Sequence, residues 1–199
     1  MLTLIVGGSA SGKSAFAENY AMEAGENRIY IATMQPMDNE CLARIEKHRG
    51  MRAQKNFQTV ECYTGLKQVR VPKDSVVLLE CMSNLTANEI YAPEGVGEDR
   101  CSEEILAGVK ALENQCRHLI IVSNEVFEGG TNYDPSTVRY LDILGKINRK
   151  LQKWRMRQRK LQQGVGSGIS REEKSNDFDS DRGIFDVFGN SDAADRMDK

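Results

Sequence analysis

The chain has 199 residues, of which 40% are hydrophobic and 28% charged, and its formal net charge at pH 7 is −2. This length and apolar content suit one globular domain, and the near-neutral charge gives no overall attraction to nucleic acid or membranes. No apolar stretch approaches the roughly 20 residues of a membrane span, and the five cysteines form no CxxC pair. We therefore expect a cytoplasmic protein with reduced thiols, no transmembrane segment and no nucleic-acid partner.

Apolar segments typical of buried strands alternate with segments of helical spacing along three quarters of the chain. The predicted strands are residues 2–6, 28–33, 57–62, 75–81 and 119–126. The predicted helices are residues 14–24, 38–52, 102–116 and 135 to about 154. Strands that alternate with helices favour a mostly parallel sheet with helices on both faces, so we predict an α/β fold of this kind.

The sequence GGSASGKS lies between the first predicted strand and the first predicted helix. Its spacing, Gly7-x4-Gly12-Lys13-Ser14, is that of a phosphate-binding loop, or P-loop. Glycines let backbone N–H groups turn toward phosphate oxygens, and the helix directs its positive N-terminus at them. Lys13 adds a positive charge for the β- and γ-phosphates, and the Ser14 hydroxyl can bind Mg²⁺. These features predict a P-loop NTPase-like fold that binds a nucleotide.

Two strand ends carry polar residues that could face the nucleotide. Glu80 ends the predicted strand VVLLE, where P-loop proteins place the carboxylate that faces Mg²⁺. A solvated strand end is the alternative. The sequence NEV at residues 124–126 could line the crevice at the ends of the strands, or it could simply cap its strand.

His48, one of two histidines, lies near the end of a charged helical segment, ARIEKHRGMR. A neutral imidazole nitrogen can attack phosphorus and form a phosphoramidate. Arg44 would share its helix face, and Arg49 and Arg52 follow, so cations are available to hold phosphates. On the residues alone, an ordinary surface histidine is the alternative. His118 opens an apolar strand and is predicted to be structural.

The character of the chain changes after Trp154. Residues 155–163 are basic and nearly without an apolar stripe, and residues 164–199 are rich in Gly, Ser and Asp. Residues 149–160 include seven Lys or Arg, but with Trp154 as their only aromatic residue they favour a solvated helix end over a nucleic-acid surface. We therefore predict a P-loop nucleotide-binding catalytic domain of residues 1–154 and a disordered tail, basic and then acidic, of residues 155–199.

Seven segments in chain order resemble the bifunctional adenosylcobinamide kinase / adenosylcobinamide-phosphate guanylyltransferase family: GGSASGKS, YIAT, ARIEKHRGMR, TVEC, VVLLEC, SNEVFEGG and LGKIN. The resemblance covers residues 1 to about 151, and its most specific parts are the RIxxHRxxR segment and the NEV strand end. It implies two reactions of cobalamin biosynthesis. ATP or GTP phosphorylates adenosylcobinamide, and GTP then donates GMP to that phosphate through a GMP–histidine intermediate, which gives adenosylcobinamide-GDP.

The resemblance also implies roles for individual residues. The nucleophilic histidine falls on His48, and Lys13 acts with it in catalysis. Glu80 would serve Mg²⁺ together with Ser14, or else the guanosine. We expect a homo-oligomer whose partners are small molecules: adenosylcobinamide, GTP and ATP. The implied nucleotide contacts are Gly7, Gly8, Ser9, Ala10, Ser11, Gly12, Lys13, Ser14, Ala32, Thr33, Met34, Arg49, Gly50, Met51, Arg52, Glu61 and Glu80.

Two other functions are compatible with the P-loop. The first is a P-loop kinase for another small molecule, without nucleotidyl transfer. The second is a nucleotide-regulated binding protein, not an enzyme, that uses the basic segment 149–160. The second leaves His48 and the NEV segment unexplained.

The sequence departs from the family pattern after LGKIN. The family has an alanine-rich helix end similar to MADEV and a final apolar strand, whereas this chain has KWRMRQRKLQQ. A one-base shift in the reading of KWRMR can encode Met-Ala-Asp-Ala. Our hypothesis is that a frameshift replaces the sequence after about Lys153. Sequencing of the coding DNA tests it: a one-base shift should restore an apolar strand, and the hypothesis is wrong if none does.

Overall fold

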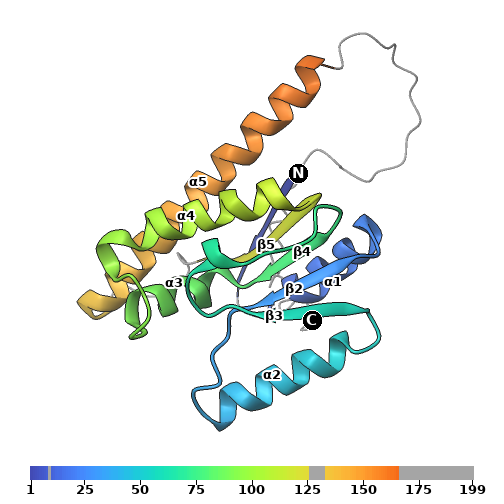
Figure 1. Ribbon diagram of the computed structural model, residues 1–199. Coiled ribbons are helices and arrows are strands. Elements are labelled where there is room, and N and C mark those ends of the chain that lie inside the picture. Colours follow the sequence, from blue (N-terminus) through green and yellow to red (C-terminus); the bar gives the residue numbers. More distant parts are fainter. Residues whose placement is uncertain (9, 126–132, 166–199) are drawn as a thin grey trace, which may run out of the picture.

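Five parallel strands form the central sheet of the computed structural model, which describes residues 1–8, 10–125 and 133–165 (Figure 1). Their spatial order is β1-β5-β4-β2-β3. The strands are β1 (Leu2–Gly7), β2 (Arg28–Ala32), β3 (Phe57–Glu61), β4 (Val76–Glu80) and β5 (His118–Asn124). The predicted α/β fold with a parallel sheet is confirmed.

Burial along each strand follows its place in the sheet. The central strands β4 and β5 are almost entirely buried, as expected for parallel strands covered on both faces. Strand β3 lies at an edge, and its Gln58, Thr59 and Glu61 are exposed. The pairing register places Ala32 opposite both Glu61 and Glu80. Two glutamates therefore flank Ala32 at the carboxyl edge of the sheet, one on each strand that pairs with β2.

Helices cover both faces of the sheet (Figure 1). On one face, α1 (Lys13–Ala24) packs Ala17 and Ala21 against alternate strand residues such as Tyr30 and Leu78. On the other face, the intervening strand residues pack against α3 (Met82–Tyr91), α4 (Glu98–Gln115) and α5 (Pro135–Val165). Helix α2 (Asn39–Arg52) lies beside β3, apart from the other helices. A short 3₁₀ helix, η1 (Leu66–Gln68), precedes β4.

The structure contains one α-helix that the sequence analysis missed. The segment MSNLTANEIY, which has no charged residue in its first turn, forms α3 directly after β4. Its Met82 and Leu85 are fully buried against the helices α4 and α5. Apolar contacts between elements, rather than local helix signals, account for this helix.

Helix α5 is longer than predicted. Leu144, Ile147 and Leu151 form a fully buried apolar stripe within the predicted range, but the helix continues past residue 154 to Val165. Residues 155–163 contain good helix formers and neither Gly nor Pro, so nothing local ends the helix there. The remainder of the predicted tail, 166–199, lies outside the described residues.

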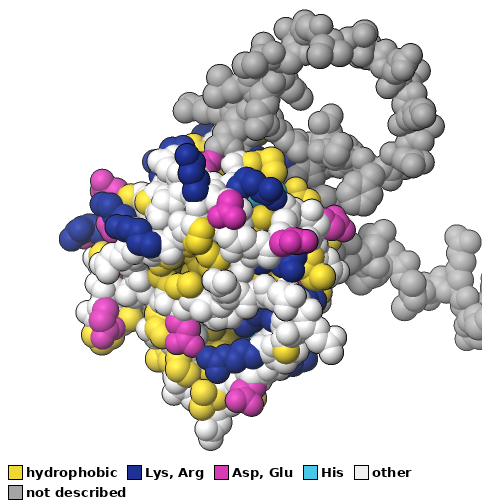
Figure 2. Space-filling model, turned by 45° about the vertical axis from the view of Figure 1, so that its right-hand side comes forward, with side chains coloured by type: hydrophobic (Ala, Val, Ile, Leu, Met, Phe, Trp, Pro, Cys, Tyr) yellow, Lys and Arg dark blue, Asp and Glu magenta, His cyan; other side chains and the backbone are white. Residues whose placement is uncertain are grey.

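On the face in Figure 2, positive and negative side chains are scattered among uncharged and hydrophobic ones over the described surface. None of the helices in the described part of the chain is long and apolar enough to cross a membrane.

His118 is buried at the start of β5. Its Nε2 lies 2.9 Å from Thr3 Oγ1, and the Tyr20 ring meets the imidazole edge-on. Burial, with smaller contributions from the N-terminal charge and Arg117, lowers the pKa of His118 to about 4. These contacts support the structural role predicted for it.

The lowered pKa makes stability depend on pH. The unfolded chain takes up a proton at His118 near pH 6.5 while the folded protein resists it, so stability should fall as the pH drops from about 6.5 toward 4. We expect this histidine to account for about 2 kcal/mol of the loss between pH 7 and pH 5. Urea unfolding of the wild type and His118→Gln at both values measures the difference. Equal losses in the two proteins would contradict the assignment.

Candidate active site

The P-loop connects β1 to α1, as the sequence predicts. Ala10 and Gly12 both have left-handed backbone conformations, with φ of 58° and 80°, and such turns direct N–H groups into a concave, anion-binding surface. Lys13 begins α1 and is buried, and its Nζ donates a hydrogen bond to the Gly8 carbonyl oxygen at 2.9 Å. The lysine charge is thus held inside the loop. Ser9 lies outside the described residues.

Glu80 joins the P-loop to the carboxyl edge of the sheet. The Ser14 hydroxyl donates a hydrogen bond to Glu80 Oε1. The other carboxylate oxygen, Oε2, is buried and has no hydrogen-bond partner among the described residues. Glu80 therefore presents one unused acceptor next to the phosphate-binding loop.

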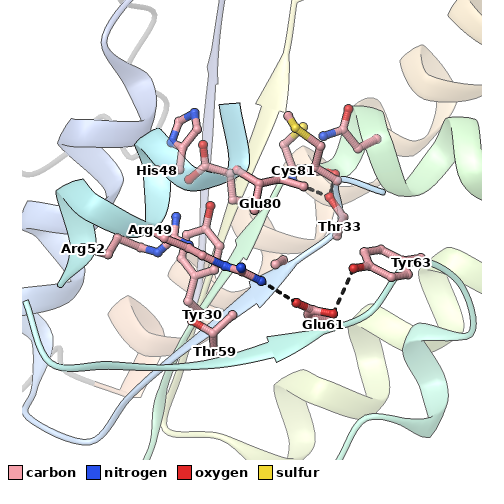
Figure 3. Close-up of a pocket in the computed structure, with 14 residues that line it drawn as sticks. Tyr30, Thr33, His48, Arg49, Arg52, Thr59, Glu61, Tyr63, Glu80 and Cys81 are labelled. Atoms are coloured by element: carbon pink, nitrogen blue, oxygen red, sulfur yellow. Dashed lines mark hydrogen bonds and ion pairs between the residues drawn. The ribbon is translucent and has the colours of Figure 1, made fainter. Parts of the chain in front are cut away.

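A pocket opens at this edge of the sheet, between strands β2, β3 and β4 and helix α2 (Figure 3). Most of the residues that the family resemblance selected outside the P-loop line it. They are Ala32, Thr33, Met34, His48, Arg49, Arg52, Glu61 and Glu80. Residues that are distant in the chain, such as Thr33, His48 and Glu80, thus converge. They do so because β2 lies between the two strands that carry Glu61 and Glu80.

His48 extends from α2 into this pocket. Its Nδ1 is buried and has no hydrogen-bond partner among the described residues. Figure 3 shows the Glu80 carboxylate beside the imidazole. The structure thus places a buried imidazole nitrogen, unpartnered in the described part of the chain, beside the carboxylate that is bonded to Ser14 of the P-loop.

Arg49 and Arg52 occupy different environments. The Arg49 Nη2 donates to Glu61 Oε1 at 2.8 Å, and both side chains are about half exposed. Arg52 is only 6% exposed, and its guanidinium carbon lies 3.6 Å from the centre of the Tyr30 ring. Its Nε and Nη1 have no hydrogen-bond partner in the described part of the chain. Arg52 can therefore offer two N–H donors to a phosphate.

Tyr30 is a pocket residue that the sequence analysis missed. Burial, followed by the nearby charge of Glu80, raises the pKa of its hydroxyl well above the ordinary value. The hydroxyl therefore stays protonated. Tyr30 thus lies under the Arg52 guanidinium and close to the charge of Glu80. Its place in an apolar strand gave no sign of this role.

Thr33 fixes the ends of the strands around the pocket. Its hydroxyl donates to the Cys81 carbonyl oxygen at 2.9 Å and accepts from the Cys81 N–H at 2.7 Å. The Asn88 side chain donates to the carbonyl oxygens of Thr33 and Tyr63. The sequence analysis missed these bridges too. The further pocket residues that it did not select are Ile45, Thr59, Tyr63, Cys81 and Asn84.

Other selected residues lie elsewhere. Asn124 is opposite Gly7 in the register of β1 and β5, so the NEV segment begins beside the P-loop rather than in the pocket of His48. Val126 is outside the described residues. Gly50 is exposed on α2 and does not line the pocket. The side chains of Arg44 and Met51 are also outside the described part.

Comparison with known proteins identifies the family to which the chain is similar. Residues 3–167 match the family described as "Cobinamide kinase / cobinamide phosphate guanyltransferase". The chain is 30% identical over 164 residues to "Bifunctional adenosylcobalamin biosynthesis protein CobU" of Salmonella typhimurium, an alignment that covers 76% of this chain and 90% of that protein. The Escherichia coli protein of that name has the same identity and coverage.

A further relative is "Bifunctional adenosylcobalamin biosynthesis protein CobP" of Pseudomonas aeruginosa. It is 29% identical over 154 residues, which cover 76% of this chain and 87% of that protein. The resemblance drawn from the sequence motifs, and the pair of transferase activities that it implies, are confirmed. The chain belongs to the cobinamide kinase / cobinamide phosphate guanyltransferase family.

Proposed function

We propose that the protein phosphorylates adenosylcobinamide with ATP or GTP and then transfers GMP from GTP to that phosphate through His48. Membership of the family supports the pair of activities. One observation carries the assignment of residues: His48 shares a pocket with Glu80, and Glu80 is hydrogen-bonded to Ser14 of the P-loop. The P-loop and the histidine therefore belong to one site.

The P-loop would hold the triphosphate for both reactions. The left-handed turns at Ala10 and Gly12, the N-terminus of α1 and Lys13 supply N–H groups and positive charge to the β- and γ-phosphates. Phosphoryl transfer requires mainly this positioning and charge neutralisation. The kinase step needs no contribution from His48.

The guanylyl transfer uses His48 as nucleophile. An imidazole nitrogen attacks the α-phosphorus of GTP, a P–N bond forms, the bond to the β-phosphate oxygen breaks, and pyrophosphate leaves. An oxygen of adenosylcobinamide phosphate then attacks the same phosphorus and displaces the imidazole, which gives adenosylcobinamide-GDP. Arg52, two of whose donors have no partner among the described residues, would bind the phosphate that is transferred.

Ser14 and Glu80 are suited to hold Mg²⁺. A hydroxyl and a carboxylate are the oxygen ligands that Mg²⁺ prefers, and phosphate oxygens and water normally complete its shell. Among the described residues, no group of three or more His, Cys, Asp or Glu side chains could hold a metal ion, so substrate phosphates would have to take part. When bound, the ion would neutralise charge on the phosphates.

We further propose a homo-oligomer that acts in the cytoplasm on small molecules. Four exposed apolar side chains support an oligomer, because association would remove them from water. Met37 lies just before α2, Leu42 lies in α2, and Val138 and Met156 lie on α5. The formal net charge of −2 supports the absence of a nucleic-acid partner, because it gives no overall attraction to phosphates.

The assignment of His48 can be tested with GTP labelled at the α-phosphate. The wild type should acquire an acid-labile label, and His48→Ala should acquire none while it keeps kinase activity within about threefold. Lys47→Ala, one position away and exposed on the same helix, is the control and should label normally. A label retained by His48→Ala would show that another residue is the nucleophile.

The proposed magnesium site predicts a second set of effects. Ser14→Ala and Glu80→Gln should each raise the Mg²⁺ concentration for half-maximal kinase activity about ten- to a hundredfold. Glu61→Gln, a carboxylate of the same pocket that is bonded to Arg49 and Tyr63, should leave that concentration unchanged. Titration of Mg²⁺ at fixed ATP measures all three, and an equal rise in Glu61→Gln would argue against the site.

A further inference from the structure

A buried ion pair connects helix α1 to the chain just after α2. The Lys55 Nζ lies 2.6 Å from Glu18 Oε2, and the two side chains are 21% and 1% exposed. Neither residue lines the pocket. The desolvation of two charges offsets much of the free energy that their attraction contributes, so such a pair adds little net stability compared with apolar packing. Its significance therefore lies in what it joins.

At one end, Glu18 belongs to the helix of the P-loop. It follows Ser14 by four residues in α1, so the two side chains lie one turn apart on the same face of the helix. Ser14 is bonded to Glu80, and the charge of Glu18 acts on the hydroxyl of Tyr30, on which Arg52 stacks. Glu18 therefore belongs to the helix that carries Ser14, and its charge reaches the Tyr30 hydroxyl of the pocket.

At the other end, Lys55 is fixed to the helix of His48. Its backbone N–H donates to the Arg52 carbonyl oxygen at 2.8 Å, and Arg52 lies one turn after His48 in α2. The Lys55 backbone is thus attached by one short turn to the end of α2 that carries His48.

Helix α2 has few other attachments at this end. Among its described side chains, Arg52 alone is buried. The ion pair of Arg49 with Glu61 joins side chains that are 55% and 49% exposed, and exposed pairs of this kind are weak. In the described part of the chain, the stacking of Arg52 on Tyr30 and the Lys55–Glu18 pair are therefore the contacts that attach this end of α2 through largely buried side chains.

We propose that the Glu18–Lys55 ion pair is the positioning device that sets His48 against the P-loop for attack on the α-phosphate. This inference rests on the proposed role of His48 as nucleophile. Attack by His48 requires α1 and α2 to be aligned, whereas phosphorylation requires the P-loop without His48. Loss of the pair should therefore impair guanylyl transfer selectively.

The central variant is Glu18→Gln combined with Lys55→Met. It removes both charges together, so it leaves no unpaired charge buried and avoids the large destabilisation that removal of one partner causes. Lys55→Arg, which keeps the charge, is the conservative variant. Lys110→Met combined with Glu113→Gln is the matched control, because it likewise removes both charges of a lysine–glutamate pair, here 2.8 Å apart on α4, whose glutamate is buried.

Three experiments distinguish positioning of His48 from general damage to the protein. The first measures covalent labelling, as the rate at saturating GTP and the KM for GTP. The second measures the kinase rate, and the third measures the hydrogen exchange of backbone amides in residues 45–52. In the central variant, labelling should slow by about ten- to a hundredfold at nearly unchanged KM, since misplacement by about 1 Å can cost that much. The kinase rate should stay within about threefold, and exchange in α2 should accelerate. Lys55→Arg and the double variant of Lys110 and Glu113 should resemble the wild type in all three.

Either of two results in the central variant overturns the proposal: labelling at the wild-type rate, or equal losses in labelling and kinase activity. Unchanged hydrogen exchange in α2 also overturns it, and this measurement does not depend on the chemistry of His48. If the wild type itself acquires no label, the nucleophile assignment fails, while hydrogen exchange still decides whether the ion pair holds the helix.

Discussion

The hydrogen bond from Ser14 to Glu80 is the interaction on which the rest of the site depends. It joins the first turn of α1 to the end of β4, and so it joins a generic phosphate-binding loop to a pocket with a specific set of side chains. The parallel register then brings Glu61 to the other side of β2, opposite the same Ala32. A parallel sheet places all its strand ends at one edge, which is why distant segments of the chain can supply one site.

The local parts of this arrangement could be predicted from the sequence. The P-loop is contiguous, and Glu80 ends a strand whose apolar run is unmistakable. Tyr30 and Thr33 could not be identified in this way, because their roles depend on neighbours across the sheet: Tyr30 touches Arg52 and Glu80, and Thr33 is bonded to Cys81. Helix α3 was missed for the same reason, since its stability comes from burial of Met82 and Leu85 between other elements.

His48 shows where reasoning from pattern alone stops. The segment around it is charged and reads as a solvated helix, and the structure agrees for most of its side chains. What sets His48 apart is that one ring nitrogen is buried beside Glu80. Composition and periodicity could not reveal this, and the family resemblance was required to select it. The extent of α5 was also underestimated, because a change of composition after Trp154 was read as the end of the helix, although no helix-breaking residue is present there.

Cations near the end of α2 appear redundant in the sequence, yet the structure gives each a different task. Arg49 is bonded to Glu61, and Lys55 is paired with the buried Glu18. Arg52 instead rests on an aromatic ring, which attracts the guanidinium through its face without occupying the N–H donors along its edge. A carboxylate in the place of Tyr30 would consume those donors and compete with an incoming phosphate. On the proposed function, an aromatic support under Arg52 keeps a buried cation ready for the substrate phosphate, while the contact of Lys55 with Glu18 is proposed to hold the helix that carries it.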